Sequence, residues 1–157
     1  MEPFRAGSWL FNVALPLVSG LASALLSGNM AEVYRSLNLP AFAPPQWMYM
    51  VVWPVLYVLK GSSAYLVRRS KALPSLKSSA MLLYGAMLLL NFAWPIIFFR
   101  LGLWELGFWV SCALLWTAAA TAIYFYRANK SAGLLLTPYL LWLTLAVLLN
   151  YAIISLN

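Results

Sequence analysis

Four tryptophans, two asparagines and one lysine lie deep inside apolar runs of this sequence, where polar atoms are costly to bury. Indole rings offer large faces for stacking on a flat apolar molecule, and a few amides usually orient the ligand in a small-molecule site. A structural role also stays open for the asparagines, because an amide in hydrocarbon needs a hydrogen-bond partner on another helix. The residues are Trp53, Trp94, Trp116, Trp142, Asn91, Asn150 and Lys60.

The residue types that are missing exclude several chemistries. The chain contains no histidine and no aspartate, and its acidic residues are Glu2, Glu32 and Glu105. Metal sites built on histidine or carboxylate clusters and triads that use histidine are therefore excluded. An axial imidazole on haem iron is excluded for the same reason. The single cysteine, Cys112, cannot form an intrachain disulfide.

Lys60 has two interpretations. It lies near the middle of an apolar block, where a charged side chain is expensive. Its distance from the nearer end of that block is roughly 10 Å along the helix, so the side chain could extend to the interface. In the second interpretation, Lys60 lines a polar cavity.

The composition is typical of a protein embedded in a lipid bilayer. Hydrophobic residues make up 64% of the 157, and charged residues only 8%, whereas a soluble domain has about 25% charged residues. Lipid is the solvent that fits, so the bilayer is an expected partner. The net charge of +7 does not indicate nucleic acid, because the basic residues stand between apolar blocks instead of on one polar face.

The expected fold is an all-α membrane protein in a single domain, a compact bundle of five transmembrane helices. A spanning helix needs about 20 mostly apolar residues, and five blocks qualify. Pro54, Pro95 and Pro138 fall within or near the start of these blocks, and each should bend its helix and leave room for a ligand. The blocks are residues 9–28, 47–67, 78–99, 104–126 and 133–154.

Basic residues predict the orientation of the helices. Seven lie on the side of the N-terminus, and only Arg35 and Arg100 lie on the opposite side. Because cytoplasmic loops are richer in Lys and Arg, we expect a cytoplasmic N-terminus and an outside C-terminus. The seven are Arg5, Arg68, Arg69, Lys71, Lys77, Arg127 and Lys130.

Small residues recur every four positions in the first block, at Ser19, Ser23 and Ser27. Helices approach closely where such residues face each other. We expect a packing seam within the bundle, and a dimer seam is the alternative.

Three segments carry a family resemblance. They are LNLPAFAPPQWMYMVVWPVLYVLKG at residues 37–61, LNFAWPIIFF at residues 90–99, and PYLLWLTLAVLLN at residues 138–150. In order and spacing they resemble the translocator protein family, also called the tryptophan-rich sensory protein or peripheral-type benzodiazepine receptor family. The chain departs from the family pattern at Phe42, at Val51 and Val52, at Lys60 where the family often has methionine, and after Tyr151, where a sterol-recognition pattern is missing.

The resemblance implies a bacterial cell-membrane protein with a ligand pocket that the first loop covers. It also implies porphyrins such as protoporphyrin IX, or haem, as ligands without an obligatory cofactor, and a homodimer as one form of assembly. Carried over by position, the ligand-binding candidates are Trp47, Trp53, Asn91, Trp94, Trp142, Ala146 and Asn150.

The expected function is a membrane receptor or sensor that binds porphyrins and related hydrophobic molecules. Two alternatives stay open. One is an enzyme that degrades porphyrin in light, in which case Trp53 and Trp142 are the catalytic candidates, and the other is a transporter of tetrapyrroles or sterols.

Overall fold

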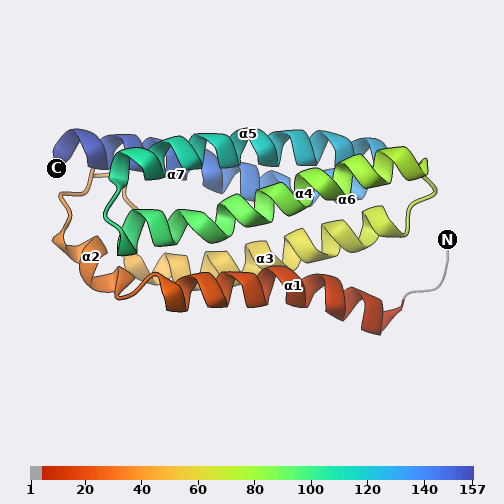
Figure 1. Cartoon of the computed structure of the whole chain (residues 1–157), viewed down its shortest axis with the longest axis horizontal. Helices are drawn as coiled ribbons and strands as arrows, with labels where there is room; N and C mark the ends of the chain where they lie inside the picture. Colours follow the sequence, from red (N-terminus) through yellow and green to blue (C-terminus); the bar gives the residue numbers. More distant parts are fainter. Residues whose placement is uncertain (1–4) are drawn as a thin grey trace.

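The computed structural model describes residues 5–157, and every secondary-structure element in that range is a helix (Figure 1). Five helical segments are long and apolar enough to cross a bilayer. This confirms the expected fold class. The segments are α1 (Ala6–Leu26), α3 (Gln46–Arg68), α4 (Pro74–Pro95) with the π-helix η1 (Ile96–Arg100), α5 (Trp104–Ala128), and α6 (Lys130–Leu134) with α7 (Thr137–Leu156).

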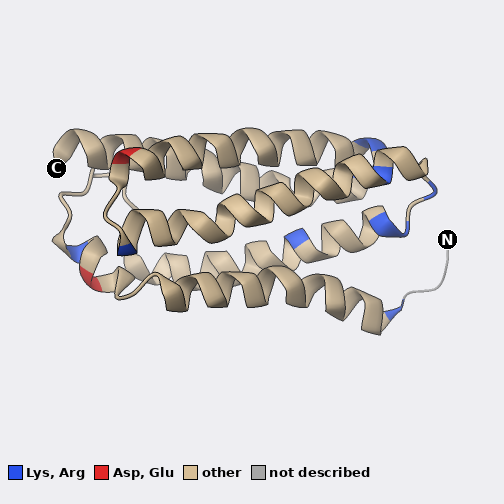
Figure 2. Ribbon diagram, viewed as in Figure 1, with Lys and Arg blue, Asp and Glu red and all other residues tan. Residues whose placement is uncertain are grey.

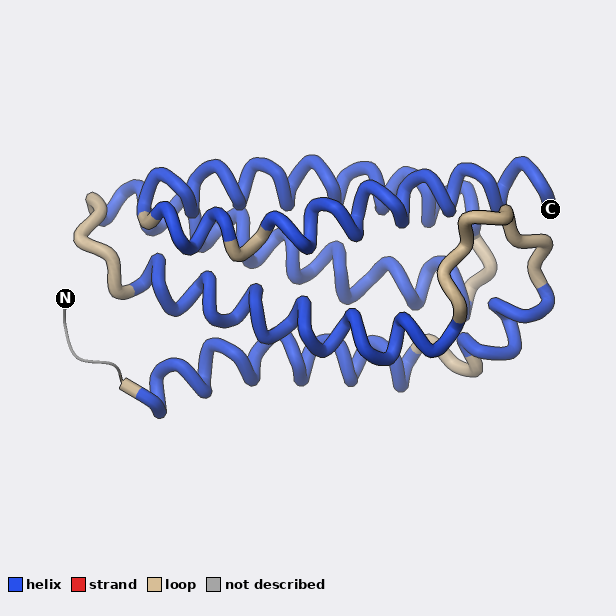
Figure 3. Tube along the Cα trace, turned by 180° about the vertical axis from the view of Figure 1, so that it is seen from behind, coloured by secondary structure: helices blue, strands red, loops and turns tan. Residues whose placement is uncertain are grey.

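The long helices lie side by side along one direction (Figures 1 and 3). Helix α1 packs against α3 and α4, and α5 packs against α4 and α7. Helix α3 meets the last span mainly through the short helix α6. The helices therefore follow one another around the bundle in the order α3, α1, α4, α5, α7. The first and the last of them, α3 and α7, make few direct contacts with each other.

The two ends of the bundle differ in charge (Figure 2). We call one end the basic end. It contains the end of α3, the start of α4, the end of α5 and the start of α6, and its basic residues are Arg68, Arg69, Lys71, Lys77, Arg127 and Lys130. We call the other the loop end, because it carries α2 (Met30–Ser36), residues 37–45 and the end of α7. Both acidic residues of the described range, Glu32 and Glu105, lie at the loop end. Glu2 falls outside the described residues.

The first loop contains a helix that the sequence analysis did not predict. Asn29 caps α2 by accepting a hydrogen bond from the Glu32 backbone N–H at 3.2 Å. Residues 37–45 then cross the loop end and attach to Asn157: the Asn38 backbone N–H donates to Asn157 Oδ1 at 2.9 Å, and Asn157 Nδ2 donates to the Asn38 carbonyl at 3.1 Å. Tyr34 secures the other side of this loop through a 2.8 Å bond to the Pro44 carbonyl.

Small residues of α1 form a seam inside the bundle. Gly20 lies directly under the ring of Tyr57. Ser23 Oγ donates a 2.6 Å hydrogen bond to the Phe92 carbonyl of α4. Both residues are buried, so the interpretation as an internal seam is confirmed at Ser23, and its neighbour Gly20 belongs to the same contact.

Two of the three prolines coincide with irregular backbone. Pro95 ends α4, and the chain continues as the π-turn of η1. Pro138 occupies the first turn of α7, where its missing N–H breaks no helical hydrogen bond. The last span is therefore two helices, α6 and α7, instead of the single continuous helix expected from its apolar pattern (Figure 3).

Candidate functional site

The interior of the bundle has two hydrophobic clusters. The larger one includes Leu56, Met87 and Leu143, and a smaller one at the loop end includes Phe98 and Leu149. Trp142 packs against the larger cluster, and Tyr49 packs against the smaller one. Their rings meet edge to face with centroids 5.4 Å apart. The predicted Trp142 therefore stands at the boundary between the two clusters.

Lys60 lies in a cage of aromatic rings. Its Nζ atom is 4.2 Å from the ring centroid of Tyr139, 4.4 Å from that of Tyr57 and 5.7 Å from that of Trp53. The side chain is 0% exposed. Because Trp53 and Tyr57 precede Lys60 on α3, the lysine extends toward the loop end and away from the nearer basic end. The interpretation in which Lys60 reaches the interface is therefore wrong.

Asn91 joins this cage through two phenol groups. The Tyr139 hydroxyl donates to Asn91 Oδ1 at 2.7 Å, and Asn91 Nδ2 donates to the Tyr57 hydroxyl at 3.4 Å. The amide on α4 thus holds one ring from α3 and one from α7. This is the interhelical partner that an amide in hydrocarbon requires.

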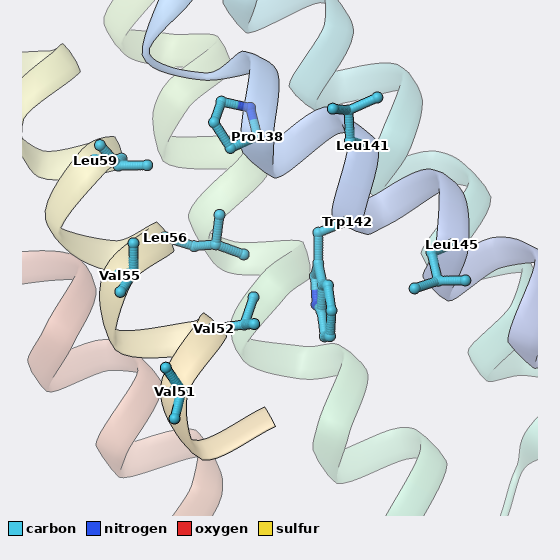
Figure 4. Close-up of a pocket in the computed structure, with 9 residues that line it drawn as sticks. All are labelled: Val51, Val52, Val55, Leu56, Leu59, Pro138, Leu141, Trp142 and Leu145. Carbon is cyan, nitrogen blue, oxygen red and sulfur yellow. The ribbon is translucent and has the colours of Figure 1, made fainter. Parts of the chain in front are cut away.

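An apolar groove of about 440 Å³ lies between α3 and α7, next to the cage (Figure 4). Leu56 forms part of its floor and is buried, whereas Val51, Val55 and Leu141 on its rim are exposed. Figure 4 shows the Trp142 ring as one wall, facing the α3 side chains. The lining residues are Val51, Val52, Val55, Leu56, Leu59, Pro138, Leu141, Trp142 and Leu145.

Trp94 and Asn150 lie closer to the loop end. Trp94 stacks on Phe98 with centroids 5.2 Å apart, and Asn150 Nδ2 donates to the Ala146 carbonyl at 2.7 Å. Trp94 Nε1 and Asn150 Oδ1 are buried without a hydrogen-bond partner in the described residues. The indole nitrogen is a hydrogen-bond donor and the amide oxygen an acceptor.

The predicted residues do not form one pocket lining. Trp142 lines the groove, while Trp53 and Asn91 belong to the cage. Trp47 is 59% exposed in the first turn of α3, at the loop end. Its position suits an interfacial tryptophan.

Sequence reasoning missed three tyrosines that organise the site, Tyr49, Tyr57 and Tyr139. A signal for Tyr57 was present, because Trp53, Tyr57 and Lys60 have the spacing i, i+4, i+7 that places side chains on one helix face. No comparable local signal points to Tyr139, which comes from another helix.

Comparison with known proteins identifies the family of this integral membrane protein. The chain is 36% identical to the translocator protein of Sus scrofa over 94% of its own length and 90% of that protein's length. It is 31% identical to the tryptophan-rich protein TspO of Chlorobaculum tepidum, over 92% of each chain. It is 32% identical to the tryptophan-rich sensory protein of Cereibacter sphaeroides, over 80% of this chain and 77% of the other. Residues 12–156 also match the profile of the TspO/MBR family, and the chain belongs to that family.

Proposed function

We propose that this protein is a membrane receptor that binds porphyrins, such as protoporphyrin IX and haem, and related hydrophobic molecules at the groove between α3 and α7. The observation that carries the proposal is the indole of Trp142 on the wall of an otherwise aliphatic groove of about 440 Å³. Small-molecule sites usually have volumes of about 300–1,000 Å³, and an indole face suits a flat macrocycle.

The groove opens on the side of the bundle, so a hydrophobic ligand would enter from the bilayer. Its exposed rim residues, Val51, Val55 and Leu141, belong to helices that are apolar enough to span the membrane. A macrocycle would be held by its faces and edges, because the chain has no histidine to bind a haem iron. The name of the relative from Cereibacter sphaeroides, a tryptophan-rich sensory protein, favours a sensory role.

Titration of the purified protein with protoporphyrin IX in the dark tests this proposal. Quenching of tryptophan fluorescence reports binding to the wild type, and the shift in porphyrin absorbance reports binding to tryptophan variants. We expect Trp142→Leu, which removes the aromatic face, to weaken binding about fivefold, since an aromatic contact contributes on the order of 1 kcal/mol. The control is Trp116→Leu on α5, whose side chain is 79% exposed and absent from the groove. Equal affinities for the two variants would contradict the proposed site.

The alternative function is light-dependent degradation of the porphyrin, with Trp53 and Trp142 as electron donors. The adjacency of these indoles to the cage and the groove favours it as the second candidate. Illumination of the same complex separates the two functions. Loss of porphyrin absorbance that disappears in Trp53→Phe, while affinity survives, supports degradation. Uptake of porphyrin into liposomes separates out transport, the role that the name of the Sus scrofa relative suggests.

The proposed location is a bacterial cell membrane, with the basic end in the cytoplasm. The concentration of Lys and Arg at that end supports this orientation, because basic residues are enriched in cytoplasmic loops. The loop end, with the attached residues 37–45, would then face outward.

A further inference from the structure

The buried amine of Lys60 has no acidic partner in the described part of the chain. Its Nζ atom has no hydrogen-bond partner there, and the side chain is 0% exposed. Glu32 and Glu105 are the acidic residues of residues 5–157, and both lie at the loop end, in α2 and in the first turn of α5 (Figure 2). Neither stands at the depth of Lys60, which is in the second half of α3.

The aromatic cage compensates the charge of a protonated Lys60 only in part. The rings of Tyr139 and Tyr57 lie 4.2 and 4.4 Å from Nζ, within the range of a cation–π contact. A buried ion still loses more in desolvation than ring faces return, unless an opposite charge lies close to it. The cage therefore leaves Lys60 without a full electrostatic partner, and a carboxylate close to Nζ would be a stronger one.

The cage adjoins the groove. Leu56 and Leu59, which line the groove, are four residues and one residue before Lys60 on α3. Pro138, on the other side, directly precedes Tyr139. Figure 4 shows Leu56 pointing from α3 toward α7, across the floor of the groove. Leu56 and the rings of Tyr57 and Tyr139 are the three side chains that would have to move for a ligand in the groove to reach Nζ.

We propose that Lys60 pairs with a carboxylate of the ligand and makes this protein selective for acidic hydrophobic molecules over their neutral esters. This inference rests on the proposed function, since the macrocycle would occupy the groove while one acidic side arm reaches the cage. The carboxylate replaces the ring faces as the partner of the ammonium and forms a charge-assisted hydrogen bond in a low-dielectric site. Lys60 would thus decide specificity, and Trp142 would supply the stacking surface.

The test compares protoporphyrin IX with its dimethyl ester, which has the same ring and no ionisable acid. Binding is measured in lipid nanodiscs against empty nanodiscs, so that partition into lipid is subtracted. The wild type should bind the acid at least tenfold more tightly than the ester. Lys60→Met should lose this preference, and Lys71→Met, which removes an exposed lysine at the basic end, should keep it.

The outcomes separate the two proposals. If neither ligand binds the wild type, the proposed function is wrong. If acid and ester bind the wild type equally well, the function stands and the inference about Lys60 is overturned, without any variant being needed. If Lys60→Met keeps the preference for the acid, another group binds the carboxylate and the inference about Lys60 is overturned. The variant Lys60→Leu repeats the measurement if Lys60→Met does not fold.

Discussion

The backbones of α1 and α3 lie in direct contact at Gly61, so that a side chain there would force the two helices apart. A Cβ atom added to Gly61 would lie only 2.6 Å from the Asn12 carbonyl oxygen and would also overlap the Val13 Cα. These are backbone atoms of the neighbouring helix, so rotation of a side chain cannot relieve the overlap. A carbon atom normally stays about 3.3 Å or more from a carbonyl oxygen. Gly61→Ala must therefore move α1 away from α3 by roughly 0.7 Å or more.

The cost of this displacement follows from the packing of protein interiors. Adding a methyl group to a filled interior costs about 1–3 kcal/mol. Alanine recovers about 0.5–1 kcal/mol of that through its better helix propensity, so we expect a net loss of up to about 2.5 kcal/mol, centred on about 1 kcal/mol. For a protein of this size, 1 kcal/mol corresponds to about 2–4 °C in Tm. Gly61→Ala should lower the Tm by about 2–4 °C at the centre of this range, and by up to about 10 °C.

Gly85→Ala is the matched control. Gly85 is also helical, in α4, but it is exposed and its added Cβ would meet no atom within 4 Å. The same propensity gain should leave its Tm unchanged or raise it by a few degrees. Thermal unfolding of both variants in one detergent, followed by circular dichroism, measures the difference. A Tm of Gly61→Ala at or above that of Gly85→Ala would refute the close approach of α1 and α3.

Three further predictions address the site, the loop and the orientation. Tyr139→Phe removes the buried 2.7 Å hydrogen bond to Asn91 and should lower the free energy of unfolding by about 1 kcal/mol. The control Tyr151→Phe, at a side chain that is 63% exposed, should have no effect, and an equal loss in both variants would contradict the hydrogen-bond network. Asn157→Ala removes two bonds to Asn38, so deuterium exchange in residues 37–45 should accelerate about 5–30-fold, and unchanged exchange would show that other contacts hold the loop. In a Cys112→Ala background, an impermeant thiol reagent added outside the cell should label a cysteine at Ser36 and not one at Ser75, and the reverse pattern would invert the proposed orientation.

The coarse architecture could be predicted because it depends on sums over many residues. Length, apolarity and the absence of charge in each block determine where a helix can cross lipid, whatever its neighbours do. Two local features were missed although each has a signal in the sequence. Asn29 with Glu32 three positions later is a helix-capping pattern that indicates the start of α2. Pro138, a residue that favours the first turn of a helix, indicates the break between α6 and α7.

The site was harder to predict because its geometry depends on pairs of helices. A tryptophan in the sequence carries no information about which neighbour its ring will face. Trp53 joins the cage because Tyr57 and Lys60 share its helix face, but the closest ring to Nζ, that of Tyr139, comes from α7. For Lys60 the sequence analysis considered extension to the interface and a position in a polar cavity. The side chains of a helix lean toward its N-terminus, and the rings of Trp53 and Tyr57 lie on the preceding turns. Together they explain why the lysine points into the bundle.

Lys60 is the position where the sequence departs most from what lipid and packing favour, and such departures tend to occur at functional sites. The surrounding contacts restrict where its charge can go. Gly61 presses α3 against α1 on one side. Toward the basic end, Ser63 Oγ donates a 2.6 Å bond to the Ala132 carbonyl and ties α3 to α6. On the side of the groove, Leu56 forms part of the floor and lies one helical turn before Lys60 on α3. A substitution that shortens this leucine, such as Leu56→Ala, would therefore open the route to the ammonium, and it should raise affinity for an acidic ligand more than for its ester.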